Sequence, residues 1–118
     1  MEQEIKKKMV ASEEVYQKNQ RVLEESLDVI AEEKRDFFQY LDNTAEQLRF
    51  ISHREVYEQS QDMGSGYRII EQAQEEAEYI LKNASRTLED RLEANQVNYR
   101  KEQHAFEDEL YSLKKEEE

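Results

Sequence analysis

The side chains best suited to hold a metal ion or move a proton are two histidines, His53 and His104. His104 lies four residues before Asp108, a spacing that places both side chains on one face of a helix. A carboxylate-bridged metal pair in a helical bundle uses two Glu-x-x-His motifs, however, and neither histidine follows a glutamate at that spacing. Because 29 of the 118 residues are Asp or Glu, an acidic neighbour is expected by chance. We therefore expect solvated surface histidines, with no metal and no cofactor.

Nucleophilic catalysis and phosphate binding find no better support. A serine nucleophile needs a base and an orienting group in a concave pocket, whereas the serines here are scattered along a highly charged chain. Residues 63–67, MGSGY, hold the only two glycines of the chain but lack the Gly-Lys-Ser/Thr ending of a phosphate-binding loop. The sequence therefore predicts a protein that is not an enzyme.

The chain is strongly acidic, with 29 Asp and Glu against 17 Lys and Arg and a formal charge of −12. Such a surface repels nucleic-acid phosphates and anionic membranes, so we expect neither nucleic-acid binding nor direct membrane binding. The N-terminus, MEQEIKKKMV, has no apolar region after its charges, and no apolar run reaches the roughly 18–20 residues of a membrane span. These features predict a soluble protein made without a cleaved signal, and they leave its compartment open. The chain also has no cysteine, which excludes disulfides.

Helices must position these side chains, because the chain has no proline and is rich in Glu, Gln, Lys, Leu, Ala and Arg. In the first half, apolar residues recur at alternating spacings of four and three, the heptad pattern of a helix that packs on another. This stripe consists of Met9, Tyr16, Leu23, Leu27, Ile30, Phe37, Leu41, Leu48 and Ile51. Three polar residues interrupt it at core positions where they can set the register of an assembly: Gln20, Lys34 and Thr44.

A second row of apolar residues, Val15, Val22 and Val29, lies one residue before the first row at seven-residue spacing. It widens the apolar face beyond a two-stranded seam and favours a bundle of three or more helices. An isolated hairpin would leave part of this row in water.

The sequence predicts a bend at residues 49–52. The stripe fades after Ile51, and Ser52 with Glu55 forms a capping box, while Ile51 and Val56 form a hydrophobic staple. A new rhythm then passes through Gly64 and Gly66 without loss of phase, which predicts that both glycines are helical. A bend at residues 63–66 is the alternative. We therefore expect one helical-hairpin domain over residues 1–118, with helices at about 3–49 and 53–115.

The fold class expected is all-α, a long antiparallel, coiled-coil-like hairpin that is part of a multi-helix bundle with a partner. The candidate partner-binding residues are the apolar positions of the two stripes. They are Leu23, Leu27, Ile30, Phe37, Leu41, Leu48, Tyr67, Ile70, Leu81 and Leu88. Phe37, Phe38 and Tyr40 cluster before the predicted bend, where they either anchor a partner or fill the wider space near a turn.

Two long helices joined by a short bend, small size and acidic charge resemble the WXG100-like proteins of type VII secretion. More closely, the segment FFQYLDNTAEQLRFISHREVYEQS, followed by a long Glu-, Leu- and Lys-rich helix, resembles the LXG-associated α-helical (Lap) targeting factors of Gram-positive type VIIb systems. Where the WXG100 pattern has Trp-x-Gly, this sequence has Leu48-Arg49-Phe50.

The resemblance implies a non-enzymatic, chaperone-like targeting factor that binds the N-terminal LXG domain of a toxin in the cytoplasm. A second small helical targeting factor is a further candidate partner, and export together with the cargo is a further expectation. The alternative is a self-associating structural coiled coil, in which copies of the chain close the same stripe as a homo-oligomer.

Overall fold

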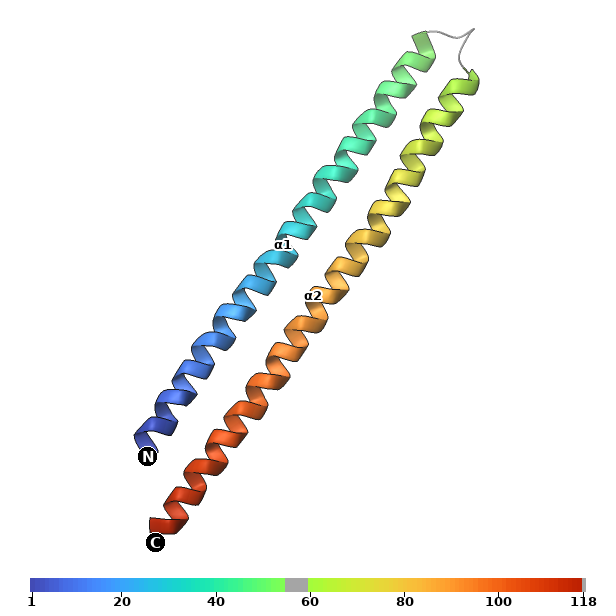
Figure 1. Cartoon of the computed structure of the whole chain (residues 1–118). Helices are drawn as coiled ribbons and strands as arrows, with labels where there is room; N and C mark the ends of the chain where they lie inside the picture. The colour runs from blue at the N-terminus through green and yellow to red at the C-terminus, as the bar shows by residue number, and fades with distance from the viewer. Residues whose placement is uncertain (55–59, 118) are drawn as a thin grey trace. The chain divides into compact units, whose positions relative to one another are not determined.

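The computed structural model describes residues 1–54 and 60–117 and shows two long helices (Figure 1). Helix α1 spans Glu2–Arg54 and helix α2 spans Ser60–Glu117. No strand occurs in the described part of the chain. The expected all-α helical hairpin is therefore confirmed.

Local sequence favours both helices from end to end. Glu2 and Glu4 lie in the first turn of α1, and Lys114 and Lys115 lie in the last turn of α2. These signs complement the helix dipole, which is positive at the N-terminus and negative at the C-terminus. Lys6 also pairs with Glu2 one turn away, at 3.6 Å between Nζ and Oε1.

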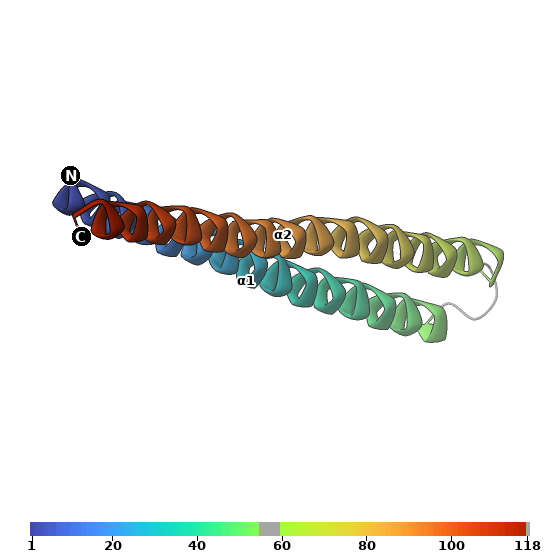
Figure 2. The ribbon, with the colours of Figure 1, turned by 90° about the horizontal axis from the view of Figure 1, so that it is seen from below.

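The backbone groups into two compact units. Unit 1 comprises Met1–Leu27 and Thr87–Glu118, and unit 2 comprises Asp28–Arg86. Within unit 1 the first part of α1 and the last part of α2 lie side by side and antiparallel, so that both termini are at the same end (Figure 1, Figure 2). Unit 2 pairs the rest of α1 with the rest of α2.

The buried and half-buried side chains of each helix recur at heptad spacing and mark the seam, the face that each helix turns to the other within its unit. Ile5 in unit 1 and Leu41 in unit 2 are the most buried, each with 7% of its surface exposed. On α1 the seam includes Ile5, Met9, Tyr16, Leu23, Leu27, Ile30, Leu41 and Leu48. On α2 it includes Tyr67, Ile70, Ala77, Leu81, Leu88, Leu92, Tyr99, Phe106 and Leu113.

The predicted bend at residues 49–52 is wrong, because all four residues are helical and α1 continues to Arg54. Fading of an apolar stripe removes packing but not the backbone hydrogen bonds, and the sequence Ser-His-Arg after Ile51 contains no helix breaker. The second helix accordingly begins at Ser60 rather than at about residue 53. The capping partners Glu55 and Val56 lie outside the described residues.

The alternative bend at residues 63–66 is also wrong, since α2 runs through it. Gly64 and Gly66 are helical, as predicted, and neither has a positive φ. The two glycines differ in their surroundings. A Cβ built on Gly66 would lie 3.1 Å from Leu48 Cδ1, whereas one built on Gly64 would meet nothing within 4 Å. At Gly66 the absence of a side chain lets α2 approach the Leu48 side chain of α1.

Candidate partner-binding surface

The residues predicted to bind a partner lie, with one exception, on the seam. In unit 1, Leu23, Leu27 and Leu88 are half-buried. In unit 2, Leu41 is buried and the half-buried positions are Ile30, Leu48, Tyr67, Ile70 and Leu81. These side chains therefore pack between α1 and α2, and their contact with a partner stays a prediction.

Phe37 is the exception, because it lies at the edge of the seam and keeps 38% of its surface exposed. Phe38, its neighbour, is half-buried and meets the Phe37 ring at a centroid distance of 6.3 Å. Tyr40, the third aromatic of the cluster, is exposed. The cluster thus presents aromatic surface to solvent instead of being fully used inside the hairpin.

Unit 2 contains an open groove of about 500 Å³ beside Phe37. Ala77 contributes only a methyl group, so the space between the larger side chains around it is unfilled. The groove is lined by Glu33, Asp36 and Phe37 from α1 and by Ala77, Ile80 and Leu81 from α2. Ile80 keeps 64% of its surface exposed.

Further exposed apolar side chains share this side of unit 2, which we call the groove face. On α1, Val29 lies one turn before Glu33, and Tyr40 lies one turn after Asp36. On α2, Ile69 lies 11 residues before Ile80, which is close to three full turns. The exposed apolar side chains of the groove face are Val29, Phe37, Tyr40, Ile51, Ile69 and Ile80.

Charge is divided unequally between the two sides of unit 2. By helical position, the charged residues described on the groove face are Glu33, Asp36 and Glu76, all acidic. The opposite side carries both signs: Arg35, Asp42, Arg49, Glu71, Glu78 and Lys82. Lys34, at a seam position, places its Nζ 5.8 Å from the centroid of Phe38, outside the groove. The groove face is therefore apolar with an acidic edge.

The valine row is exposed, as expected for a hairpin that covers only one side of a broad apolar face. Val15, Val22 and Val29 each keep more than half of their surface in solvent. Val29 belongs to the groove face of unit 2, while Val15 and Val22 lie in unit 1.

The seam of unit 1 is polar at its middle. Asn95 Nδ2 donates to Gln20 Oε1 at 3.0 Å and to the carbonyl oxygen of Tyr16 at 3.3 Å. Gln103 Nε2 donates to the carbonyl oxygen of Met9 at 3.3 Å. Each bond links α1 to α2 at a fixed register, so Gln20 has the register-setting contact expected of a polar core residue.

The other two polar interruptions of the stripe behave differently. Thr44 donates its hydroxyl to the carbonyl oxygen of Tyr40, one turn back in the same helix, at 2.9 Å. Such a bond satisfies the hydroxyl locally and links nothing across the seam. Lys34 is exposed, with its ammonium over the Phe38 ring. Both interactions stay within α1, so they do not set the register of unit 2.

Tyr16 and Tyr99 stack across unit 1, with ring centroids 4.2 Å apart and planes 10° apart. Burial, the Glu13 carboxylate and Tyr16 itself, in that order, raise the pKa of Tyr99 above its ordinary value of 10.0. The raised pKa keeps the Tyr99 phenol protonated. The stacked rings therefore pack α1 against α2 within unit 1.

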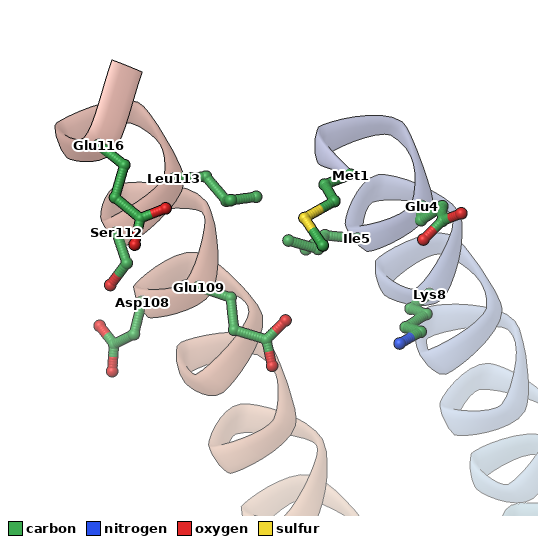
Figure 3. A pocket seen from close by; sticks show the side chains of 9 residues that line it. All are labelled: Met1, Glu4, Ile5, Lys8, Asp108, Glu109, Ser112, Leu113 and Glu116. Carbon is green, nitrogen blue, oxygen red and sulfur yellow. The ribbon is translucent and has the colours of Figure 1, made fainter. Parts of the chain in front are cut away.

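A hollow of about 440 Å³ lies at the end of unit 1 where the termini meet. Met1, Ile5 and Leu113 point toward one another across it (Figure 3). Carboxylates and one ammonium group surround this apolar floor: Glu4, Lys8, Asp108, Glu109 and Glu116. This arrangement supplies an apolar hollow with an acidic rim, and its walls include no histidine.

The two histidines lie apart along the chain. His104 is exposed, and its Nδ1 lies 3.6 Å from Glu107 Oε2 rather than close to the Asp108 carboxylate. His53 is also exposed. Among the described residues, no group of three or more His, Cys, Asp or Glu side chains is placed to hold a metal ion. Over the same residues, neither helix contains a segment long and apolar enough to cross a membrane.

Sequence reasoning placed Ala77 on the apolar stripe of the second helix but missed Ile69 and Ile80 as parts of a surface. The signal was present, since Ile69 and Ile80 each stand one residue before a seam position, Ile70 and Leu81. Adjacent residues on a helix point about 100° apart, so an apolar residue beside each seam position widens the apolar face beyond the seam.

No family model matches the chain, and no curated protein or solved structure matches it either. The placement of the chain's own side chains therefore carries the argument for its function.

Proposed function

We propose that this protein is a non-enzymatic helical adaptor that binds a helical partner through apolar surface left open by its own hairpin. In its specific form, the proposal is a chaperone-like targeting factor that binds the N-terminal LXG domain of a toxin for type VIIb secretion. The specific form rests on the resemblance of residues 37–60 and the following helix to the Lap factors. The general form rests on the groove face.

The groove face carries the proposal because a monomeric soluble protein rarely exposes a contiguous apolar patch without a use for it. Here Phe37, Tyr40 and Ile80 are exposed beside a groove, in a chain whose residues are 39% charged. Aromatic and aliphatic side chains around a hollow are the usual anchors of a protein interface.

Deletion of this chain and co-purification with the toxin test the specific form. In a strain that makes a type VIIb LXG toxin, loss of this chain should abolish export of the toxin and leave its synthesis unchanged. The tagged LXG domain should retain the wild-type chain at a fixed stoichiometry. Normal export in the deletion strain, together with failure to co-purify, would overturn the targeting function.

The second candidate is a self-associating structural coiled coil, favoured by the exposed valine row of α1. Val15, Val22 and Val29 are spaced like one position of a heptad and remain exposed in the hairpin. Sedimentation equilibrium separates the two functions. Self-association that Val22→Glu abolishes would favour the structural coiled coil, whereas a monomer that binds the LXG domain would favour the adaptor.

A further inference from the structure

We infer that the groove face of unit 2 docks an amphipathic α-helix of another protein whose apolar stripe is flanked by Lys or Arg. This inference rests on the proposed adaptor function and identifies both the surface and the chemistry of its occupant. It moves the binding site from the seam, where the sequence pattern places it, to the side of the hairpin beside Phe37 and Ile80.

The shape of the groove fits one helix side by side with α1 and α2. A third helix that packs on a helical pair presents large side chains to the depression between them. Ala77 leaves that depression about 500 Å³ in volume, with Phe37 on one side and Ile80 and Leu81 on the other. A leucine or aromatic side chain of the partner would occupy it and cover the exposed surface of Phe37 and Ile80.

The charge of the face selects the flanks of the partner. Glu33 and Asp36 line the groove, and Glu76 lies one turn before Ile80 on α2. By helical position, no lysine or arginine shares this side within residues 28–51, 53 and 64–86, the part of unit 2 whose side chains the structure describes. A basic flank would therefore be attracted and an acidic flank repelled, so charge would act chiefly on specificity and association rate.

The same argument excludes a second copy of this chain as the occupant. A two-fold dimer through the groove face would bring the same acidic-edged surface of both copies together. Glu33, Asp36 and Glu76 of one copy would then meet carboxylates of the other, with no cation on either face to pair with them. The basic residues that could pair, such as Arg35 and Arg49, lie on the opposite side.

Two neighbouring residues supply a matched pair of variants. Ile80 and Tyr79 are both large, apolar and exposed, at 64% and 70%, but only Ile80 lines the groove. The probes are a synthetic amphipathic helix with a leucine stripe flanked by lysines, and its counterpart with glutamates in their place. Binding is measured by fluorescence anisotropy, with circular dichroism to confirm that each variant keeps its helix content.

The wild-type chain should bind the lysine-flanked helix about tenfold or more tighter than the glutamate-flanked one. Ile80→Asp should weaken binding by about tenfold or more, because it removes an anchor and leaves the others open to water, whereas Tyr79→Asp should change it by less than about twofold. Equal effects of the two substitutions would overturn the inference.

A second matched pair tests the charge argument with two double variants that have the same net charge as each other. Each replaces two carboxylates by lysines, on a different side of unit 2. Glu33→Lys with Asp36→Lys should abolish or invert the preference for the lysine-flanked helix. Glu71→Lys with Glu78→Lys, on the opposite side, should preserve it. Equal loss of the preference for the lysine-flanked helix in both double variants would show that net charge alone sets it, and would overturn the assignment of the face. Sedimentation equilibrium tests the choice of occupant. A dimer of the wild-type chain that Ile80→Asp dissociates would also overturn the inference.

The same variants with the LXG domain separate this inference from the proposed function. Undiminished binding of Ile80→Asp to the domain would contradict the groove face and leave the targeting function standing. If the chain distinguishes the lysine-flanked helix from the glutamate-flanked one but does not bind the LXG domain, the groove face is supported and the toxin-specific function is overturned.

Discussion

At the scale of single residues, the two glycines of α2 have opposite surroundings. Gly64→Ala adds a methyl group in open space, so it should raise the free energy of unfolding by up to about 1 kcal/mol through helix propensity. Gly66→Ala gains the same propensity but places its Cβ 3.1 Å from Leu48 Cδ1, which must shift. We expect the gain at Gly66 to be smaller or reversed.

Urea denaturation of the two glycine variants checks this expectation, with each compared to the wild-type chain at the same protein concentration. An equal or larger stabilisation by Gly66→Ala would show that Leu48 does not press on this position. The side-chain end of Leu48 would then be free to move at no measurable cost.

A second residue-scale prediction concerns the alkaline titration of Tyr99. Its raised pKa means that the folded state holds the phenolic proton more tightly than the unfolded state does. The resulting contribution to stability is complete below pH 10, the ordinary pKa, and is lost as the pH rises through the raised pKa. Glu13→Gln removes one cause, so Tyr99 should then titrate at lower pH.

Ultraviolet absorbance of the phenolate, compared with a Tyr99→Phe variant, isolates this one tyrosine among the seven. Glu14→Gln is the control, since Glu14 is not among the causes of the raised pKa. Equal displacement of the titration by both glutamine variants would contradict the assignment to Glu13.

At the scale of the helices, the polar contacts of unit 1 fix the register of α1 against α2. Asn95→Ala would leave Gln20 Oε1 and the Tyr16 carbonyl oxygen without this donor. We expect the free energy of unfolding to fall by about 1–2 kcal/mol, as for loss of a partly buried hydrogen-bond donor. Asn98→Ala, at an exposed position of the same helix, should change it by less than about 0.5 kcal/mol.

Thermal and urea unfolding of these two variants give the comparison. Because alanine favours a helix more than asparagine does, propensity alone would stabilise both variants. Equal changes in both would therefore contradict a stabilising role for the bonds to Gln20 and Tyr16. The substitutions change propensity alike, so the difference between them reports the contacts of Asn95.

The heptad stripe was sufficient to predict two antiparallel helices and most of the seam, because burial on a helix follows its 3.6-residue period. The bend could not be located in this way. Ser52 and Glu55 match the sequence pattern of a capping box, yet serine is also tolerated inside a helix, where Ser52 lies. Loss of the stripe after Ile51 therefore did not mark the end of α1, which continues to Arg54.

The groove face was predictable in part. Phe37 was identified from its place in the heptad stripe and Ala77 from the stripe of the second helix, but Ile80 was not identified. The juxtaposition of Phe37 with Ala77 and Ile80 depends on how α1 and α2 are paired in unit 2, and a single helical pattern does not contain that pairing. A small residue opposite an aromatic becomes a groove only once the register is known.

At the scale of the whole molecule, the described part of the chain has little apolar surface that is fully removed from water. Even its most buried described side chains, Ile5 and Leu41, keep 7% of their surface exposed. We expect a modest melting temperature for the chain alone and a clear rise with its partner, because a ligand that binds only the folded state adds about 2.7 kcal/mol at 100 times its Kd.

Calorimetry of the chain with and without the LXG domain measures this gain, and the Ile80→Asp variant serves as the control that should lose it. A high melting temperature that is independent of concentration and of the partner would contradict the expectation. The hairpin would then be complete without a third helix.

The most direct test of the account is a thiol-protection measurement on the groove face. Because the chain has no cysteine, Ile80→Cys and Tyr79→Cys each carry one reactive thiol. With the LXG domain at roughly ten times its Kd, maleimide labelling of the Ile80→Cys variant should slow about tenfold while that of Tyr79→Cys changes little. Unchanged labelling at both positions, with complex formation verified in the same samples, would contradict the account.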